Sequence, residues 1–130
     1  MKLLEVVAAI IIVDNKILCT KRDKSKFEYV SFKYEFPGGK IEVGEDEETA
    51  LKREIMEELK MNIYDLKKFY TVNHTYPDFK LKMYSYLCNT NSEKIILREH
   101  IKFKWLKVKE LDMLDWAEAD IPIVKKLQGE

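Results

Sequence analysis

The chain has 130 residues, and 46% of them are hydrophobic, which is enough to fill the core of one domain spanning residues 1–130. Its 23 basic and 23 acidic side chains give a formal net charge of zero. Proteins that bind a nucleic-acid polymer or an anionic membrane through their overall field carry excess positive charge. We therefore expect neither as a partner, and we expect local groups of residues to bind any charged ligand.

Two features bear on the cellular compartment. Cys19 and Cys88 lack the spacing of a metal site, and each lies in an apolar segment, which favours buried, reduced thiols. The apolar segment at residues 3–13 is interrupted by Glu5, has no small-residue cleavage site and is too short to span a bilayer. We interpret this segment as a strand and expect a cytoplasmic protein.

The first third of the chain predicts a hairpin followed by loops. Residues 6–13 are apolar at both odd and even positions, as in a strand that is buried on both faces. Asp14 and Asn15 favour a turn, and residues 17–22 have the composition of the partner strand. Residues 34–45 contain proline and glycine without a helical period, which indicates a loop with short extended pieces.

The rest of the chain predicts helices before and after a group of strands. Asp46 is the expected N-cap of a helix that ends near Leu59, because acidic residues fill its first turn. Strands are expected at residues 66–76, 80–88, 94–100 and 103–108. Asp120 is a candidate N-cap of a last helix, with Pro122 in its first turn. These elements predict an α/β fold of the α/β/α sandwich type.

Three glutamates, Glu54, Glu57 and Glu58, crowd about one turn of the predicted helix. With about 100° between successive residues, they lie on a flank beside the apolar stripe of Leu51, Ile55 and Leu59. Like charges at this spacing repel one another by roughly 0.2–0.5 kcal/mol per pair. Without a counter-ion, we expect at least one of these partly desolvated carboxylates to have a raised pKa.

A hard divalent cation is the natural counter-ion for such a cluster. Mg²⁺ binds through a few carboxylates together with substrate phosphates and water. Gly38 and Gly39, just upstream, offer a backbone that can approach a phosphate or a metal closely. The alternative, which the helix by itself favours, is a solvent-exposed acidic face held by ion pairs such as Glu48–Lys52 and Arg53–Glu57.

Residues 39–61, GKIEVGEDEETALKREIMEELKM, resemble the signature of the Nudix hydrolases, G-x5-E-x7-R-E-U-x-E-E-x-G-U, where U is aliphatic. The matching positions are Gly39, Glu45, Arg53, Glu54, Ile55, Glu57, Glu58 and Met61. Lys60 replaces the late glycine, which helps to end the helix in a left-handed conformation that lysine resists. We therefore expect Asn62, which tolerates that conformation, to end the helix slightly later.

The resemblance covers most of the chain and is closest to the MutT-like branch, the nucleoside triphosphate pyrophosphohydrolases. It implies a Nudix-type sandwich with a mixed sheet and a loop-helix-loop catalytic motif. It also implies a set of ligands for Mg²⁺, with Mn²⁺ as a substitute, made of the Gly38 carbonyl, Glu54, Glu57, Glu58 and Glu99. Glu45 and Arg53 would orient this cluster. For Glu99 the alternative of a single exposed acid stays open.

The implied reaction is attack of water on a nucleoside triphosphate, giving nucleoside monophosphate and pyrophosphate. Glu54 is our candidate for the carboxylate that takes the proton, with Glu58 and Glu99 as rivals, because the position of the base varies within the family. Candidate phosphate contacts are Lys40, Lys21 and Arg22. For Lys21 and Arg22, a solvated strand end is at least an equal alternative.

A nucleotide base needs an apolar slot with a few fixed polar groups. Candidate stacking partners are Phe36, Tyr76 and Phe79, each of which would also serve as ordinary core. Residues 116–124 resemble the family segment that closes over the base, and they include Asp120. A carboxylate there would accept hydrogen bonds from an exocyclic amine, where the MutT type itself has an amide. This difference favours a cytidine or modified nucleotide over strict preference for 8-oxo-dGTP, while the role of a helix cap stays open.

Two other functions remain open. A Nudix hydrolase of ADP-ribose or dinucleoside polyphosphates needs room for a second nucleoside, and we see no extra domain or long substrate loop. A non-catalytic nucleotide sensor on the same fold would relieve its charge repulsion by losing the acids, and here they are all present. Lys60 is the feature that favours the sensor. The sequence does not distinguish a monomer from a homodimer.

Overall fold

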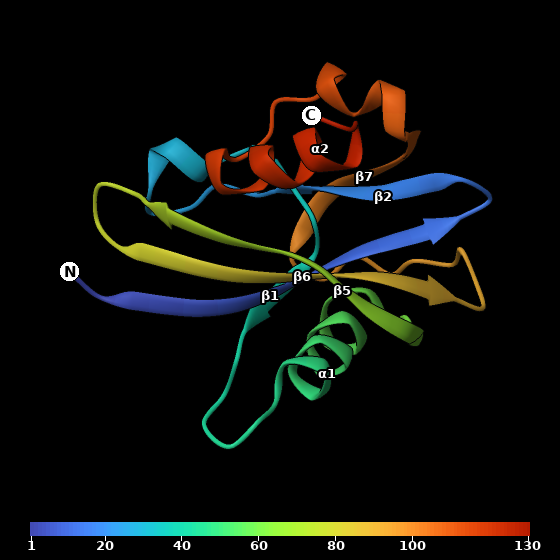
Figure 1. The fold of residues 1–130 in the computed structure, drawn as a ribbon, viewed down its shortest axis with the longest axis horizontal. Helices are drawn as coiled ribbons and strands as arrows, with labels where there is room; N and C mark the ends of the chain where they lie inside the picture. The colour runs from blue at the N-terminus through green and yellow to red at the C-terminus, as the bar shows by residue number, and fades with distance from the viewer.

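The computed structural model describes all 130 residues (Figure 1). Its strands are β1 Leu3–Val13, β2 Lys16–Arg22, β3 Tyr34–Glu35, β4 Gly38–Lys40, β5 Ile63–Thr75, β6 Lys80–Thr90 and β7 His100–Lys107. Its α-helices are α1 Glu47–Leu59 and α2 Ile121–Leu127, and its 3₁₀ helices are η1 Glu28–Val30, η2 Val108–Met113 and η3 Glu118–Asp120. None of these helices has the length and apolar character needed to cross a membrane.

The sheet is built around β1, in the order β3-β2-β1-β6-β5, with β4 paired to β1 and β7 paired to β2. β1 runs parallel to β6 and antiparallel to β2 and β4. The expected hairpin is present, because the strands on either side of Asp14 and Asn15 pair with each other. The predicted mixed sheet is therefore confirmed.

The two faces of β1 belong to different hydrophobic clusters. Val7, Ala9 and Ile11 pack in the cluster that contains the apolar stripe of α1. Ala8 and Ile10 pack in the cluster that contains the buried residues of α2. The two helices lie on opposite sides of the sheet (Figure 1). This arrangement confirms the α/β/α sandwich and explains why β1 is apolar at successive positions.

Helix α1 begins as predicted and ends at the predicted residue by an unexpected route. The Asp46 carboxylate accepts a hydrogen bond from the Thr49 N–H at 2.8 Å. Lys60 follows the last helical residue and itself adopts the left-handed conformation, with φ 56° and ψ 38°. Asn62 has no positive φ, so our expectation that it ends the helix was wrong. The reason is packing: Leu59 and Met61 are both buried, so the chain reverses at the exposed position between them.

The segment after β6 differs from the prediction. The expected strand at residues 103–108 lies largely within β7, whereas residues 94–98 form no strand. Their backbone bonds to α1 instead: the N–H groups of Ile96 and Arg98 each donate at 3.1 Å to carbonyl oxygens at the end of the helix, those of Leu59 and Glu58. The last carbonyls of a helix have no partner within it, and this segment supplies two donors.

Candidate active site

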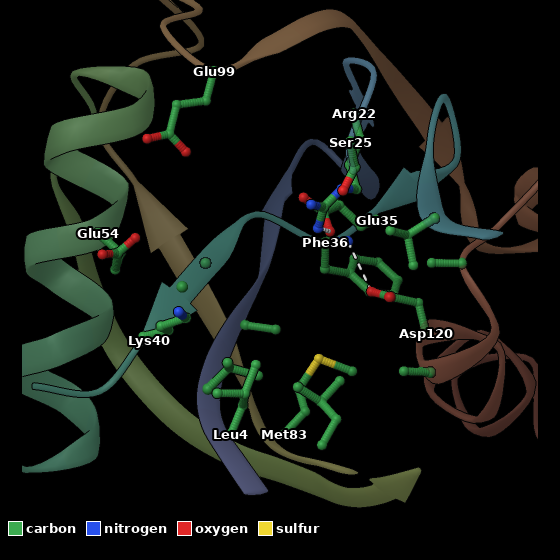
Figure 2. Close-up of a pocket in the computed structure, with 18 of the residues that line it drawn as sticks. Leu4, Arg22, Ser25, Glu35, Phe36, Lys40, Glu54, Met83, Glu99 and Asp120 are labelled. Carbon is green, nitrogen blue, oxygen red and sulfur yellow. Dashed lines mark hydrogen bonds and ion pairs between the residues drawn. The ribbon is translucent and has the colours of Figure 1, made fainter. Parts of the chain in front are cut away.

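A cavity of about 790 Å³ extends from the flank of α1 to the segment around η3 (Figure 2). Glu54 and Glu99 lie at one end of it, and Phe36 and Asp120 lie at the other. The predicted site residues that line it are Arg22, Phe36, Gly38, Lys40, Glu54, Glu58, Tyr76, Phe79, Glu99 and Asp120. The tertiary structure therefore gathers most of the residues that the sequence analysis singled out.

Four predicted residues do not line the cavity: Lys21, Glu45, Arg53 and Glu57. The Lys21 ammonium lies 5.9 Å from the centre of the Tyr34 ring. Successive side chains of a strand point to opposite faces, so Lys21 and Arg22 cannot both face the cavity. This alternation was visible in the sequence, and the structure gives no support to Lys21 as a phosphate contact.

At the acidic end, one turn of α1 places Glu54 and Glu58 toward the cavity. The Glu54 side chain is 17% exposed and that of Glu58 is 4% exposed, whereas Glu57 is 57% exposed. The backbone bond from Arg98 to the Glu58 carbonyl brings the neighbouring Glu99 to this end of the cavity. The acids thus come together from a helix and from an irregular segment distant in sequence.

The electrostatics of this cluster agree with the sequence prediction of a raised pKa. Burial, together with the carboxylates of Glu99, Glu35 and Glu54, raises the pKa of Glu58 to about 9. Burial also raises the pKa of Glu54, although the adjacent Arg53 guanidinium opposes this effect. In both groups, desolvation of the charged form is the largest cause.

The donor set at the acidic end fits a divalent cation. The Glu58 Oε1 atom is buried and has no hydrogen-bond partner. A Cβ atom at Gly39 would collide with the Glu54 carboxylate, so the absence of a side chain lets this acid approach the backbone. Carboxylate and carbonyl oxygens are the ligands that Mg²⁺ and Mn²⁺ prefer. As the side chains stand, no three Asp, Glu, His or Cys residues converge on one point, and Glu57 is turned away toward Arg53.

Arg53 connects the acids of the helix to the loop before it. Its Nε donates to Glu45 at 2.6 Å, and its terminal nitrogens donate to Glu45 at 2.9 Å and to Glu54 at 2.8 Å. It also bonds the Lys40 carbonyl at 3.0 Å and Glu57 at 3.2 Å. The guanidinium lowers the pKa of Glu45 to about 2. The orienting contacts expected of Arg53 and Glu45 are therefore present, with the two-point geometry that arginine favours.

At the other end, an aromatic wall surrounds a buried carboxyl group. Phe36 stacks on Trp116, with ring centres 4.7 Å apart, and the rings of Tyr76 and Phe79 lie 5.2 Å apart. Asp120 is 5% exposed and accepts a hydrogen bond from the Phe36 N–H at 3.0 Å. Burial, with a contribution from the Glu35 carboxylate, raises the pKa of Asp120 well above its ordinary value.

Asp120 stands at the predicted N-cap position of α2, with Pro122 in the first turn, but the capping contact of its side chain is absent. Its carboxyl makes no cap hydrogen bond, and its backbone is already helical, with φ −86° and ψ −19°. An N-cap residue has an extended backbone that directs its side chain back over the first turn. Here η3 leads directly into α2, and the side chain points into the protein instead.

Among the polar residues of the cavity that sequence reasoning missed, Glu35 and His100 contact each other. The His100 Nε2 atom lies 2.9 Å from the Glu35 carboxylate, and the two residues are 65 positions apart. Glu35 is also ion-paired to Arg22 at 3.2 Å. Glu35 begins a segment, residues 35–42, that resembles the MutT-like entry into the signature, but no role was predicted for it, and His100 reaches it only through the pairing of β2 with β7.

The comparisons with known proteins agree on one family. The model of the NUDIX domain matches residues 3–127. The chain is 34% identical over 128 residues to an 8-oxo-dGTP diphosphatase of Buchnera aphidicola subsp. Schizaphis graminum, which covers 98% of this chain and 95% of the relative. It is 32% identical over 127 residues to a CTP pyrophosphohydrolase of Escherichia coli strain K12. That match covers 96% of this chain and 91% of the relative.

A solved structure agrees with these relatives. The solution structure of the MutT protein of methicillin-resistant Staphylococcus aureus 252, described as a Nudix hydrolase, is 44% identical to this chain and superimposes with a TM-score of 0.74. The match covers 98% of this chain and 97% of that protein. The signature, the fold, the family match and the relatives point the same way: the chain belongs to the Nudix family and is a MutT-like hydrolase.

Proposed function

We propose that the protein hydrolyses a nucleoside triphosphate to nucleoside monophosphate and pyrophosphate, with Mg²⁺ as cofactor and Mn²⁺ as a substitute. The observation that carries this proposal is that one continuous cavity has carboxylates at one end and an aromatic wall with a buried carboxyl at the other. A nucleotide has the same polarity, with phosphates at one end and a planar base at the other. The enzymatic names of the relatives support the same class of substrate.

The residues of the acidic end would bind the cation and the phosphates. The proposed ligands are Glu54, Glu57, Glu58, Glu99 and the Gly38 carbonyl, and Glu57 would have to exchange Arg53 for the ion. When bound, the ion neutralises phosphate charge and makes the attacking water more acidic. Glu54 is the proposed base, with Glu58 and Glu99 as rivals, because it borders the cavity while Arg53 holds its orientation. Lys40 and Arg22 would contact the phosphates.

The residues of the other end would bind the nucleoside. Phe36, Tyr76 and Phe79 offer apolar contacts for a base, and the Asp120 carboxyl would accept a hydrogen bond from an exocyclic amine. Cytosine and guanine both carry such an amine. We propose a cytidine or an oxidised nucleotide as substrate, and the relatives named for CTP and for 8-oxo-dGTP support both. The buried, free thiols of Cys19 and Cys88 suit the proposed cytoplasmic setting.

A panel of unmodified and oxidised nucleoside triphosphates tests this function. Each nucleotide is incubated with Mg²⁺, with Mn²⁺ or with a chelator, and the products are separated by chromatography. We expect monophosphate and pyrophosphate only when the metal is present, with the highest kcat/KM for a cytidine or an oxidised nucleotide. Release of nucleoside diphosphate, or equal turnover with the chelator, would refute the proposal. The Glu54→Gln protein serves as the inactive control.

A further inference from the structure

A buried imidazole joins the two ends of the cavity. His100, the first residue of β7, has a side chain that is 3% exposed and lines the cavity. Its Nε2 atom lies 2.9 Å from the Glu35 carboxylate, and its Nδ1 atom lies 4.0 Å from the carboxylate of Glu58. Nδ1 has no hydrogen-bond partner. His100 therefore stands between a residue of the acidic end and a residue beside the nucleoside end.

Glu35 is held from both sides. Arg22 approaches its Oε1 at 3.2 Å, and His100 approaches its Oε2 at 2.9 Å. An ionised carboxylate only accepts, so His100 donates through Nε2. Each oxygen keeps a free lone pair, and the side chain is 21% exposed toward the cavity, next to Phe36 (Figure 2). Two donors thus fix the direction in which Glu35 presents its remaining acceptor sites.

An irregularity in the pairing of β2 with β7 positions His100 beside Glu35. Lys21 pairs with Lys102, but Arg22 pairs with His100, because the register of β2 and β7 shifts between Lys21 and Arg22. Without the shift, Ile101 would lie opposite Arg22. Opposed residues share a face of the sheet, and an extra residue exchanges the faces of those that follow. The shift therefore directs His100 to the cavity together with Arg22, and Ile101 is left 47% exposed.

We propose that His100 is a positioning residue for substrate recognition, which acts by holding the Glu35 carboxylate toward the hydrogen-bond donors of the nucleoside. The inference rests on the proposed function and deepens it, because it assigns discrimination between nucleosides to the pair Glu35 and His100. The ring also fills the space between Glu35 and Glu58. It therefore separates the Glu35 carboxylate, which would bind the nucleoside, from the Glu58 carboxylate, which would bind the cation. Burial of an imidazole with one unpaired nitrogen lowers the stability of the fold, so packing by itself does not account for a histidine at this position.

The test compares two substitutions. His100→Leu removes the donor, and His100→Gln retains an N–H at a similar reach. We expect His100→Leu to raise KM for the preferred nucleotide by at least about tenfold and to flatten the nucleotide ranking, while kcat changes little. His100→Gln should restore most of the ranking. Glu35→Gln should reproduce the effect of His100→Leu, and the double variant should be no worse than either single variant, because both act through one contact.

Controls separate this inference from folding and from the proposed function. Lys102→Leu, an exposed substitution on the same strand, should leave the ranking unchanged, and thermal melts identify any variant that fails to fold. Calorimetry measures the affinity for nucleoside monophosphates without any turnover. This measurement still tests the role of His100 if the wild type hydrolyses no triphosphate. A folded His100→Leu protein that keeps the wild-type ranking would overturn the proposal. So would an equal loss of kcat for every nucleotide with KM unchanged.

Discussion

Asp120 and Phe36 are joined by a hydrogen bond from the Phe36 N–H to the Asp120 carboxyl at 3.0 Å, although 84 positions separate them in the chain. A second bond reinforces the contact, because the Ala119 N–H donates to the Tyr76 hydroxyl at 3.0 Å. Together they attach the segment before α2 to the aromatic wall of the cavity. Asp120, which the sequence suggests as a helix cap, is thus part of the wall beside the proposed nucleoside site.

Asp120→Ala should raise KM and reduce discrimination among nucleotides by up to about tenfold, because the exocyclic amine loses its acceptor and a hydrogen bond between neutral groups contributes about 0.5–1.5 kcal/mol. The variant should also lose stability, since the buried Phe36 N–H loses its acceptor. Asp120→Asn keeps an acceptor but adds a donor, so we expect an altered ranking with little loss of melting temperature. Steady-state kinetics on the nucleotide panel measure both effects. An unchanged ranking in both variants would contradict a role in recognition.

Glu54→Gln and Glu57→Gln should each reduce turnover by orders of magnitude while the fold survives. Each change removes one charge from the proposed metal site, and it also relieves repulsion, so the metal-free proteins should be no less stable than the wild type. Glu48→Gln, an exposed acid on the same helix, is the matched control and should retain turnover. Measurement of kcat at saturating Mg²⁺ decides the matter. Near-normal kcat in both variants would refute their assignment as ligands.

Glu58→Gln should alter how the metal-free protein responds to pH. The folded pKa of Glu58 is raised to about 9, above an ordinary value near 4.3, so the folded state binds more protons between these values. The unfolding free energy of the wild type should therefore decrease as pH rises through this range. Thermal melts in chelator at pH 6 and pH 9 should show a smaller decrease for the variant. Parallel curves for the two proteins would show that Glu58 has no raised pKa.

Glu45→Gln should alter how stability depends on pH in the acidic range. The direction is opposite to that for Glu58, because the folded pKa of Glu45 is lowered. Arg53 lowers the folded pKa of Glu45 to about 2, so its stabilising contribution is present above the ordinary value near 4.3 and is lost as pH falls toward 2. The variant should be less stable than the wild type at pH 6, and the difference should shrink by pH 3. Urea unfolding at the two pH values measures this. A difference that does not depend on pH would mean that charge on Glu45 is not the cause.

Lys60→Gly should stabilise the protein by about 0.5–1 kcal/mol, because glycine adopts the left-handed conformation without the strain that a side chain causes. Asn62→Gly is the matched control and should not stabilise, since Asn62 has no positive φ. Turnover should be unchanged by Lys60→Gly. Urea unfolding gives the stability difference. Stabilisation by the Asn62 variant in place of the Lys60 variant would show that the helix ends later in solution.

Much of the fold was readable from the sequence because its signals are local. The apolar run of β1, the cap at Asp46 and the stripe of α1 each follow from the direction in which neighbouring side chains point. The crowding of Glu54 and Glu58 on one flank follows from the helical period, and with it the raised pKa of Glu58. The signature added the contacts of Arg53 and Glu45, which the structure shows.

Other features were decided only when distant segments met. The sequence by itself determined that acids gather on α1, but the tertiary structure decided that the 94–98 segment bonds the end of that helix and brings Glu99 to them. A shift of one residue between β2 and β7 decided that His100, and not Ile101, faces the cavity. Side-chain direction within an element follows from its period, whereas register and long-range backbone hydrogen bonds depend on how whole elements pack, which no local pattern records.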